Sequence, residues 1–315
     1  MTSVHELAEM VREAPAMQAK RDLSIVRRLA ARIDGDDAAA IPHGDEYLIV
    51  CGEAIVPTFL HHDPHAAGAA AVITNVSDVR AMGARPLGLV DMLVCPDREL
   101  AETVLDGIAW AAALLGVDVV GGHLTLGHPP ALSASCTGVA RRPLLGSRAR
   151  PGDVLLAAFS LEGRYTEGTT YFSSLRDRAP ESLRSDGEAL IEVADHGLAH
   201  AARDISMPGV AGSLLQMLEA TGCGATLELE LIPRPPGVDL ERWLITFPSF
   251  GYVLTAPPER AREATEPFIR RGLACRACGR LDDSGVLRLD VGGETATVWD
   301  LHREPFTRLG TDRST

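Results

Sequence analysis

The chain is nearly devoid of lysine. Of its 30 basic residues only Lys20 is a lysine, and all the others are arginines. A Walker A loop, a protein kinase and a Ser-x-x-Lys acyltransferase each need a lysine at a fixed place in their motif. Lys20 stands in the segment Gln18-Ala19-Lys20-Arg21, which fits none of these motifs. The sequence therefore excludes all three classes.

Other common signatures are missing as well. No Gly-x-Ser-x-Gly, His-Glu-x-x-His or Gly-x-Gly-x-x-Gly motif occurs. Aromatic residues make up only 4% of the chain, and its formal net charge is -13. An acidic, aromatic-poor chain argues against nucleic acid and against an anionic membrane as the main partner. Small molecules, or metals that bridge the protein to anions, match this composition better.

The sequence also shows no segment for export or membrane insertion. Residues 1–13 carry His, Glu and Arg without an apolar stretch, so we expect no signal peptide. The segment 119–140 has no charged side chain, but histidines, a glycine pair and Pro129-Pro130 interrupt it, which argues against a membrane span. Six cysteines are scattered along the chain, mostly in apolar runs. These features predict a reduced, cytoplasmic protein.

Composition divides the chain into two parts. At 315 residues it exceeds the size at which single cores stop growing. Residues 141–152 are rich in Arg, Pro and Gly, as domain junctions are. We place the domains at residues 1–146 and 147–306, followed by a polar tail at residues 307–315. Helical and strand patterns alternate in both parts, which predicts an α+β (α/β-like) fold with each sheet covered by helices.

Periodicity and cap signals give the individual elements. Helices are predicted for residues 22–33, 65–81, 97–115, 208–221 and 259–271, with a further helix opened by the capping box Ser185-x-x-Glu188. Strands are predicted for residues 47–51, 86–94, 117–120, 132–140, 154–159, 225–231, 286–291 and 295–299.

A first candidate for chemistry is the acidic turn Gly35-Asp36-Asp37-Ala38-Ala39. Adjacent carboxylates on a tight turn repel each other, and a hard cation such as Mg²⁺ would relieve the repulsion by taking their oxygens as ligands. The simpler interpretation of an isolated Asp-Asp pair is a solvated turn. The residues alone leave both interpretations open.

A second candidate lies in the alanine-rich helix predicted for residues 65–81. Asn75 and Asp78 are three residues apart and therefore share one face of the helix. Small apolar residues surround Asp78 in the sequence, and a carboxylate in such surroundings needs a metal or a charged partner. Arg80 or Arg85 would be a purely structural partner, so a metal and an ion pair are both open.

Two further segments could contact a ligand through the backbone. Gly121 and Gly122 directly follow the predicted strand 117–120, where open sheets bind ligands, although an ordinary tight turn is the alternative. Asp204-Ile205-Ser206-Met207-Pro208-Gly209 precedes a helix whose first turn offers free N–H groups to phosphate. The alternative there is that Ser206 simply caps the helix.

Together and in this order, the four segments resemble the ATP-binding superfamily of aminoimidazole ribonucleotide (AIR) synthetase, which has the PurM-like fold. The acidic turn is similar to its Gly-Asp-Asp-Ala-Ala element. Residues 75–86, which read Asn-x-Ser-Asp-x-x-Ala-Met-Gly-Ala-x-Pro, resemble its most specific signature. Residues 149–153 resemble the opening of its second domain, and Asp204-x-Ser206 its Asp-x-Ser/Thr element. The resemblance implies a homodimer whose N-terminal sheets close into a shared barrel, with ATP and Mg²⁺ at its mouth.

Within that superfamily the residues point in different directions. Thiamine-monophosphate kinase would carry an acid directly after its Gly-Gly pair and after its Asp-x-Ser/Thr element, where this chain has His123 and Met207. Selenophosphate synthetase is similar in its Gly-Gly-His element and in an Asp-Pro like Asp63-Pro64. That family, however, uses a cysteine or selenocysteine ahead of its Gly-Asp-Asp, and the first cysteine here is Cys51. A branch described only as AIR synthase-related fits best.

The resemblance implies a set of site residues. The metal ligands would come from Asp36, Asp37, Glu53, Asp78 and Asp204. ATP would be contacted by Asp36, Asp37, Asn75, Asp78, Gly121, Gly122, Thr125, Ser206 and Gly209. The catalytic residues would be Lys20, the only ammonium side chain available to reach a phosphate, and His123.

We therefore expect an ATP- and Mg²⁺-dependent enzyme, a kinase or a ligase, acting on a small molecule that the sequence does not identify. Such a transfer needs positioning and charge neutralisation rather than a nucleophilic side chain. A catalytically silent ATP-binding sensor or scaffold is the alternative, because His123 and Met207 replace two acids of the kinase branch. A zinc-dependent protein using His61, His62 and His65 is a third hypothesis. Cys275-x-x-Cys278 lacks a second pair and is read as buried or idle thiols.

Overall fold

The computed structural model describes residues 2–29 and 35–309, which fall into two compact units. The unit named here the C-terminal unit comprises residues 1–36, 144–176 and 196–315, and the N-terminal unit comprises residues 37–143 and 177–195. The units change at residues 143 and 144, close to the boundary placed at residue 146 from composition. The two units nevertheless interleave along the chain. Both are mixtures of helices and strands, so the expected α+β class is confirmed.

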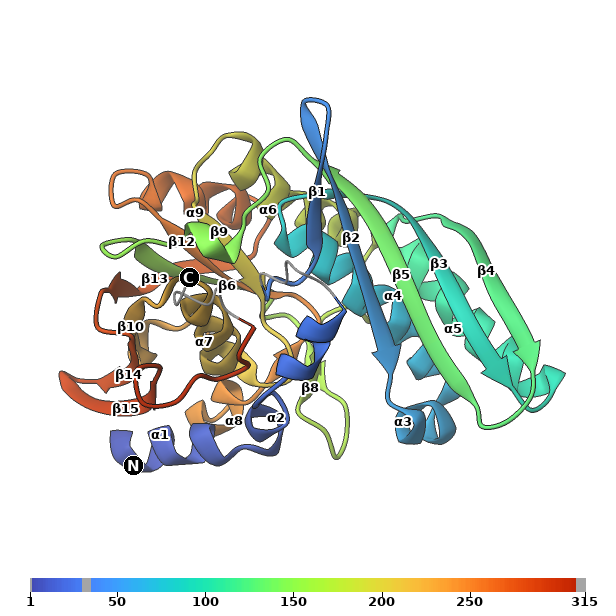
Figure 1. Cartoon of the computed structure of the whole chain (residues 1–315), viewed down its shortest axis with the longest axis horizontal. Coiled ribbons are helices and arrows are strands. Elements are labelled where there is room, and N and C mark those ends of the chain that lie inside the picture. The colour runs from blue at the N-terminus through green and yellow to red at the C-terminus, as the bar shows by residue number, and fades with distance from the viewer. Residues whose placement is uncertain (1, 30–34, 310–315) are drawn as a thin grey trace. The chain divides into compact units, whose positions relative to one another are not determined.

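The N-terminal unit holds a five-stranded sheet in the order β1, β2, β5, β3, β4 (Figure 1). Only β3 and β4 pair in parallel, and the other neighbours are antiparallel. The strands are β1 (Ala39–His43), β2 (Glu46–Ile55), β3 (Arg85–Cys95), β4 (Val119–Leu126) and β5 (Ala131–Ala140). The edge strand β4 is therefore the return strand after a helical crossover from β3.

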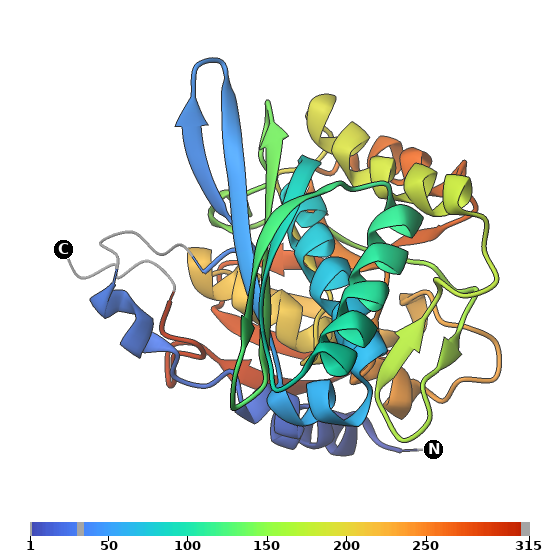
Figure 2. The same cartoon turned by 90° about the vertical axis from the view of Figure 1, so that its right-hand side faces the viewer.

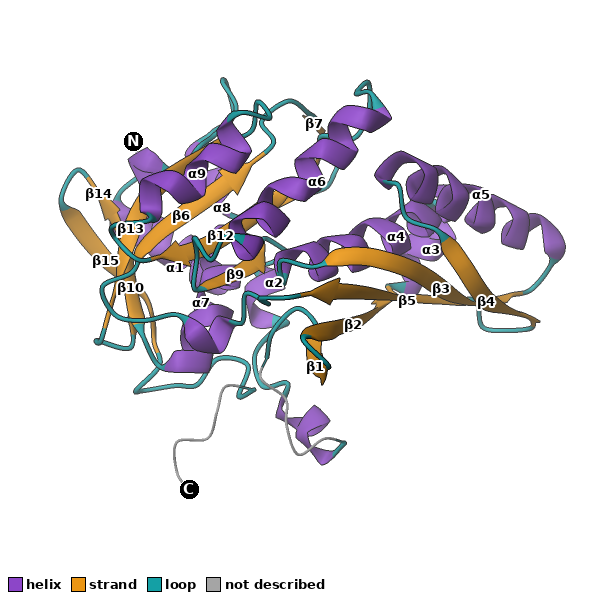
Figure 3. Cartoon of the chain, turned by 90° about the horizontal axis from the view of Figure 1, so that it is seen from above, coloured by secondary structure: helices purple, strands orange, loops and turns teal. Residues whose placement is uncertain are grey.

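Helices cover one face of this sheet (Figures 2 and 3). They are α3 (Pro57–His62), α4 (Pro64–Ala81) and α5 (Arg98–Leu115), and α6 (Pro180–Asp195) packs on α4 and α5. α4 and α5 cross at very short range, because a β-carbon on Gly68 would lie 2.1 Å from the Val104 carbonyl oxygen. Asp97 caps α5, and Gly116 ends it with φ +69°. The helices predicted for residues 65–81 and 97–115 are thus confirmed.

The C-terminal unit is built on a seven-stranded sheet in the order β15, β14, β10, β13, β6, β12, β9. The strands are β6 (Val154–Phe159), β9 (Ala201–Asp204), β10 (Gly224–Glu228), β12 (Gly251–Ala256), β13 (Ala274–Asp282), β14 (Val286–Val291) and β15 (Glu294–Asp300). A small second sheet consists of β7 (Arg164–Tyr165), β8 (Tyr171–Ser173) and β11 (Phe247–Pro248).

The core of this unit lies between the large sheet and the helices on it. α1 (Val4–Glu13) and α7 (Gly209–Thr221) share one apolar cluster with the strands, and α9 (Ala261–Ile269) packs on the opposite face (Figures 1 and 3). The remaining short elements are α2 (Pro15–Gln18), α8 (Leu240–Leu244), and the 3-10 helices η1 (Ser24–Arg28), η2 (Gly146–Arg148) and η3 (Leu229–Leu231). None of the described helices combines the length and the apolar composition that crossing a membrane requires.

Several expected elements are wrong in extent. The helix expected over residues 22–33 is the short 3-10 helix η1, and its second half falls on residues 30–34, outside the described part of the chain. Asp22 does not cap a helix there, because it has φ +54° and turns its carboxylate to the Ser24 N–H. α6 begins at Pro180, so Ser185 lies inside the helix and opens no capping box. The polar tail expected from residue 307 is anchored at its start, since Thr307 is 3% exposed.

Candidate functional site

Two carboxylates of the N-terminal unit come together. Asp78 lies in α4 and is only 7% exposed, and half-buried Asp37 lies just ahead of β1. An oxygen of Asp37 and an oxygen of Asp78 are within 4.8 Å of each other. Ionised carboxylates this close repel each other strongly unless a cation or a proton lies between them. A pair of hard oxygen donors at this spacing fits a divalent cation such as Mg²⁺.

Asp36 performs a different task from its neighbour. Within the C-terminal unit its Oδ1 accepts a hydrogen bond of 2.9 Å from the Gly146 N–H. A β-carbon on Gly146 would lie 2.5 Å from that oxygen, so the approach requires glycine. Arg203 Nη1 donates to the Gly35 carbonyl oxygen at 2.7 Å. The structure therefore uses one oxygen of Asp36 to anchor the turn, and it is Asp37 that lies beside Asp78.

Asn75 supports α4 from inside. Its side chain is completely buried, and its Nδ2 donates to the Ala71 carbonyl oxygen at 2.8 Å. The Cys51 thiol on β2 donates to Asn75 Oδ1 at 3.3 Å. Burial raises the pKa of Cys51, and it raises the pKa of Cys136 to about 11, so both thiols stay protonated. These contacts explain why an amide stands here, and the contact of Asn75 with ATP stays a prediction.

The glycine pair lies within a strand rather than after one. Gly121 and Gly122 are in the middle of β4, and Gly122 is the register partner of Asp91 on β3. A β-carbon on Gly122 would lie 2.1 Å from Asp91 Oδ1, so the carboxylate of Asp91 occupies the space above Gly122. The glycine pair was expected to follow a strand, with an ordinary tight turn as the alternative, and both placements are wrong. Glycine is needed at position 122 for contact with a protein side chain.

Asp91 is a candidate residue that the motifs do not reveal. It is 7% exposed, and burial raises the pKa of its carboxyl group above the usual value. The available signal was a lone acid within the apolar strand predicted for residues 86–94. Two residues predicted for the site, His123 and Thr125, lie on the neighbouring strand β4 and are exposed. The Nε2 atom of His123 lies 3.1 Å from Thr125 Oγ1. Their contacts with ATP or substrate stay predictions.

Glu53 does not join the carboxylate pair. It is an exposed residue of β2, and it is not among the side chains close enough to share a metal with Asp37 and Asp78. Arg85, one of the structural partners considered for Asp78, pairs instead with Glu188 at 3.5 Å and Asp195 at 3.4 Å. The role of Glu53 as a metal ligand stays a prediction.

The remaining predicted ligands lie in the C-terminal unit. Asp204 is the last residue of β9 and is 6% exposed. Ser206 does not cap α7 with its side chain, and its N–H donates to Ser213 Oγ at 3.0 Å. Gly209 begins α7 with φ +68°, where a β-carbon would lie 2.1 Å from the Leu244 carbonyl oxygen. Its N–H already donates to the Ser206 carbonyl oxygen at 2.9 Å, so a contact of that amide with phosphate stays a prediction.

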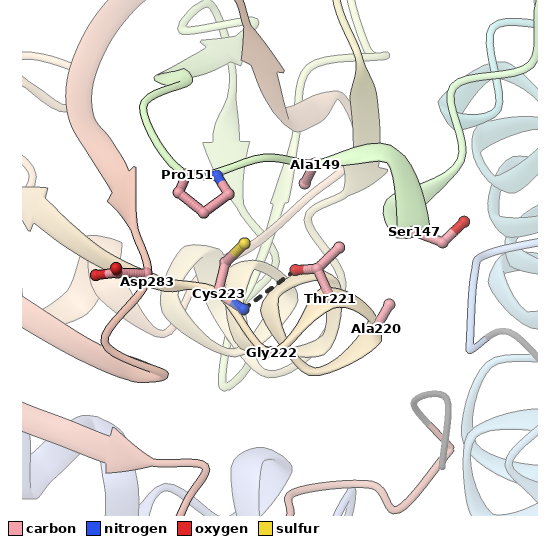
Figure 4. A pocket seen from close by; sticks show the side chains of 8 residues that line it. All are labelled: Ser147, Ala149, Pro151, Ala220, Thr221, Gly222, Cys223 and Asp283. Carbon is pink, nitrogen blue, oxygen red and sulfur yellow. Dashed lines mark hydrogen bonds between the residues drawn. The ribbon is translucent and has the colours of Figure 1, made fainter. Parts of the chain in front are cut away.

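A cavity of about 410 Å³ lies in the same unit, but at the other end of α7 (Figure 4). It is lined by Ser147, Ala149, Pro151, Ala220, Thr221, Gly222, Cys223 and Asp283. Figure 4 shows the Cys223 N–H donating to Thr221 Oγ1, a bond of 3.2 Å. None of the residues predicted for the site lines this cavity. Asp204, Ser206 and Gly209 lie at the beginning of α7, and the cavity lies where the helix ends.

The other sequence candidates have structural explanations. Asp63 caps α4 by accepting a 2.9 Å hydrogen bond from the Ala66 N–H, and the His65 ring lies 6.1 Å from the Trp110 ring. Within residues 2–29 and 35–309, no group of three close metal-binding side chains includes His61, His62 or His65. Cys275 and Cys278 are free and buried, as the idle-thiol interpretation holds, and burial raises the pKa of Cys275 to about 12.

Lys20 lies in the C-terminal unit, in the turn that follows α2. Its side chain is half-buried, and its backbone N–H donates to the Met17 carbonyl oxygen at 3.1 Å. No described contact of Lys20 places its ammonium group at the carboxylate pair. Its catalytic role stays a prediction.

Comparison with known proteins follows the same division of the chain. Residues 35–140 match the family model of the AIR synthase related protein, N-terminal domain, and residues 150–292 match that of its C-terminal domain. A protein of Synechocystis sp. named Uncharacterized protein sll0787 is 34% identical over 87% of this chain and 85% of its own length. Selenide, water dikinase of Myxococcus xanthus is 32% identical over 63% of this chain and 59% of its own length.

Among solved structures, PurL of T. maritima complexed with ADP superposes with a TM-score of 0.78. The identity is 21%, so this likeness concerns the fold alone. The match covers 98% of this chain and 53% of the PurL chain, so the chain spans about half the length of that protein.

Proposed function

Because the chain belongs to the AIR synthase related family and has its two-domain PurM-like fold, we propose that it uses Mg-ATP to phosphorylate or activate a small molecule. The observation that carries the proposal is the carboxylate pair of Asp37 and Asp78, whose oxygens lie within 4.8 Å of each other. In the proposal Asp204 adds a third carboxylate. Two similar proteins support this class of reaction: one is a selenide, water dikinase, and the other, PurL of T. maritima, was solved with ADP.

The proposed chemistry is transfer of the terminal phosphoryl group of ATP to an oxygen of the acceptor. The acceptor oxygen forms a bond to the γ-phosphorus, the bond from that phosphorus to the β,γ-bridging oxygen breaks, and ADP leaves with the electron pair. Mg²⁺ bound at the carboxylates would neutralise charge on the triphosphate. In a ligase the phosphate would then be displaced by a nitrogen nucleophile. A kinase would release the phosphorylated acceptor.

The residues of β4 are proposed to serve the acceptor side. His123 is exposed, and its Nε2 lies 3.1 Å from Thr125 Oγ1. In the tautomer whose Nε2 donates to Thr125, Nδ1 can accept the proton of the attacking hydroxyl. Asp91 behind Gly122 adds a buried carboxyl group to the same pair of strands. A site on an exposed edge strand allows an acceptor to enter without opening the core.

We further propose that the N-terminal sheet is completed by a second copy of the chain. Large apolar side chains are exposed on the edge strand β4, where Val120 is 67% exposed, Leu124 49% and Leu126 63%, and on its neighbour β3, where Met92 is 41% exposed. Apolar exposure of this kind at a sheet edge favours association with another strand. A homodimer with a shared barrel, as the resemblance implies, would cover these side chains. Light scattering should then give twice the mass of the chain.

The proposed reaction is tested by ADP formation. The wild-type protein is incubated with ATP, Mg²⁺ and fractions of a small-molecule extract, and ADP is measured with a coupled assay. We expect one fraction to stimulate ADP formation, Asp78→Asn to abolish the stimulated rate, and Asp45→Asn, at an exposed position of the β1–β2 turn, to leave it unchanged. A stimulated rate that survives Asp78→Asn would refute the carboxylate assignment.

The sensor or scaffold remains the second candidate, because His123 and Met207 stand where the kinase branch has acids. It would bind Mg-ATP tightly and release no ADP with any fraction. Measuring nucleotide affinity alongside turnover therefore separates it from the enzyme.

A further inference from the structure

The chain fastens its C-terminal segment with one carboxylate. The segment Glu304–Leu309, named here the strap, runs across Glu219 of α7 in the C-terminal unit. Glu219 accepts hydrogen bonds from the N–H groups of Phe306, Thr307 and Arg308 at 2.7, 2.9 and 3.1 Å. It also accepts one from the Thr307 hydroxyl group. One carboxyl group thus accepts from four donors of three consecutive residues of the strap.

The strap is held from its other side as well. Its Phe306 and Thr307 carbonyl oxygens accept from the N–H groups of Asp22 and Leu23 at 3.0 and 2.8 Å. Phe306 is fully buried, and its ring packs at 5.1 Å from the ring of Trp299. The strap is therefore an ordered part of the unit rather than a trailing end.

The far end of the strap reaches the acidic turn. Leu309 follows the fastened residues, and its Cβ would lie 3.4 Å from a β-carbon placed on Gly35. Gly35 has φ +75°, a conformation that favours glycine, and its carbonyl oxygen accepts from Arg203. The turn is thus held by hydrogen bonds from Arg203 and, through Asp36, from Gly146, and Leu309 of the strap lies next to it. Asp37 directly follows Asp36 in the chain.

Neither segment of this arrangement belongs to the matched family domains. The family models cover residues 35–140 and 150–292, so Asp22–Leu23 and the strap both lie outside them. Residues 22–23 and the strap therefore flank the two matched domains, and the strap lies beside the acidic turn at Gly35, the first residue that the N-terminal model covers.

We propose that Glu219 is a positioning residue, which holds the strap against Gly35 and thereby sets the affinity of Asp37 for the divalent cation. The inference rests on the proposed function, because it needs a cation at Asp37 and Asp78. A turn that is already held in place loses less conformational entropy when the cation binds, so affinity rises without any new ligand. Binding is reciprocal, and the cation must stabilise the strap by the same factor.

The test replaces Glu219 by glutamine in the full-length chain. The glutamine side chain would keep one acceptor oxygen but present an NH₂ group to donors that now have a carboxylate oxygen. Mn²⁺, which takes the same oxygen ligands as Mg²⁺ and is visible by electron paramagnetic resonance, is titrated with and without ATP. We expect Mn²⁺ to bind about tenfold more weakly to Glu219→Gln, within the usual range of coupling between sites. Glu230→Gln, at an exposed residue of the same unit, is the matched control and should leave the affinity unchanged.

A second readout separates positioning from general stability. Hydrogen exchange of the Phe306, Thr307 and Arg308 amides is followed in the wild-type chain, and Mn²⁺ should slow it by a factor similar to the loss of affinity in Glu219→Gln. If Glu219→Gln does not fold, Thr307→Val replaces it. That variant removes the hydroxyl contacts with Glu219 and with the Leu309 N–H at 3.1 Å, and it should weaken Mn²⁺ binding by a smaller factor.

The outcomes distinguish the two proposals. Weaker Mn²⁺ binding in the variants together with slower exchange in the metal-bound wild type supports the inference. The inference is overturned if a folded Glu219→Gln chain binds Mn²⁺ with wild-type affinity, or if the strap amides exchange at the same rate with and without Mn²⁺. Either result leaves the proposed function standing. A wild-type chain that binds no Mn²⁺, with or without ATP, overturns the proposed function itself.

Discussion

Replacing Gly122 by alanine tests whether that glycine serves the protein or a ligand. A β-carbon there would lie 2.1 Å from Asp91 Oδ1, 2.9 Å from Asp91 Cγ and 2.9 Å from the Asp91 backbone oxygen. The carboxylate can turn away, but it is buried and the backbone oxygen is fixed in the β3–β4 ladder. Overpacking of this kind costs about 1–3 kcal/mol. We therefore expect Gly122→Ala to lower the free energy of unfolding by about that amount in urea titrations.

A double-mutant cycle assigns the cost to Asp91. In the Asp91→Ala background the side-chain clash is gone, so Gly122→Ala should cost less by about 0.5–3 kcal/mol, the usual coupling of contacting residues. Gly121→Ala is the matched control, because its β-carbon would meet only Val90 Cγ1 at 3.8 Å. A coupling energy of zero, or equal costs at positions 121 and 122, would refute the reasoning and return Gly122 to a ligand-facing role.

Three further expectations follow from the structure. Burial raises the pKa of Asp91 above its ordinary value of 3.8, so the folded state binds this proton more tightly than the unfolded state does, and the free energy of unfolding should fall as pH rises from 3.8 through the raised pKa. Asp91→Asn should remove part of that fall in urea titrations between about pH 4 and 8; identical pH profiles would exclude the effect. Gly68→Ala should destabilise the chain by about 1–3 kcal/mol or more in the same titration, because its β-carbon would lie 2.1 Å from the Val104 carbonyl oxygen, and a neutral change would contradict the helix crossing. Leu126→Asp, on the exposed edge of β4, should convert the proposed dimer to a monomer in light scattering, whereas an unchanged mass would place the interface elsewhere.

Elements with local start and stop signals could be predicted from the sequence. α5 has Asp97 as its N-cap, an apolar face and Gly116 at its end, and all three signals act within the helix itself. β4 could not be predicted in full, because the glycine pair resembles a turn until Asp91 is known to lie above Gly122. The helix expected over residues 22–33 failed for a related reason. Its first residues hydrogen-bond to Phe306 and Thr307, which are almost the whole chain away.

The candidate site could also be predicted only in part. The acidic motifs predict Asp37 and Asp78 as metal ligands, and the structure brings an oxygen of each within 4.8 Å of the other. The sequence could not separate Asp36 from Asp37, because the difference depends on Gly146, a residue of a distant segment whose N–H binds Asp36. Asp91 and Glu219 were missed because a lone acid in an apolar strand or on a helix carries no motif, and their roles come from tertiary contacts.

The most direct measurement is calorimetric titration of the wild-type chain with ATP, in the presence and absence of Mg²⁺, with Asp78→Asn as the comparison. The account requires binding with Mg²⁺ that weakens strongly when the cation is withheld, and a similar weakening in Asp78→Asn with the cation present. ATP binding of equal affinity with and without Mg²⁺, or no detectable binding under either condition, would contradict it.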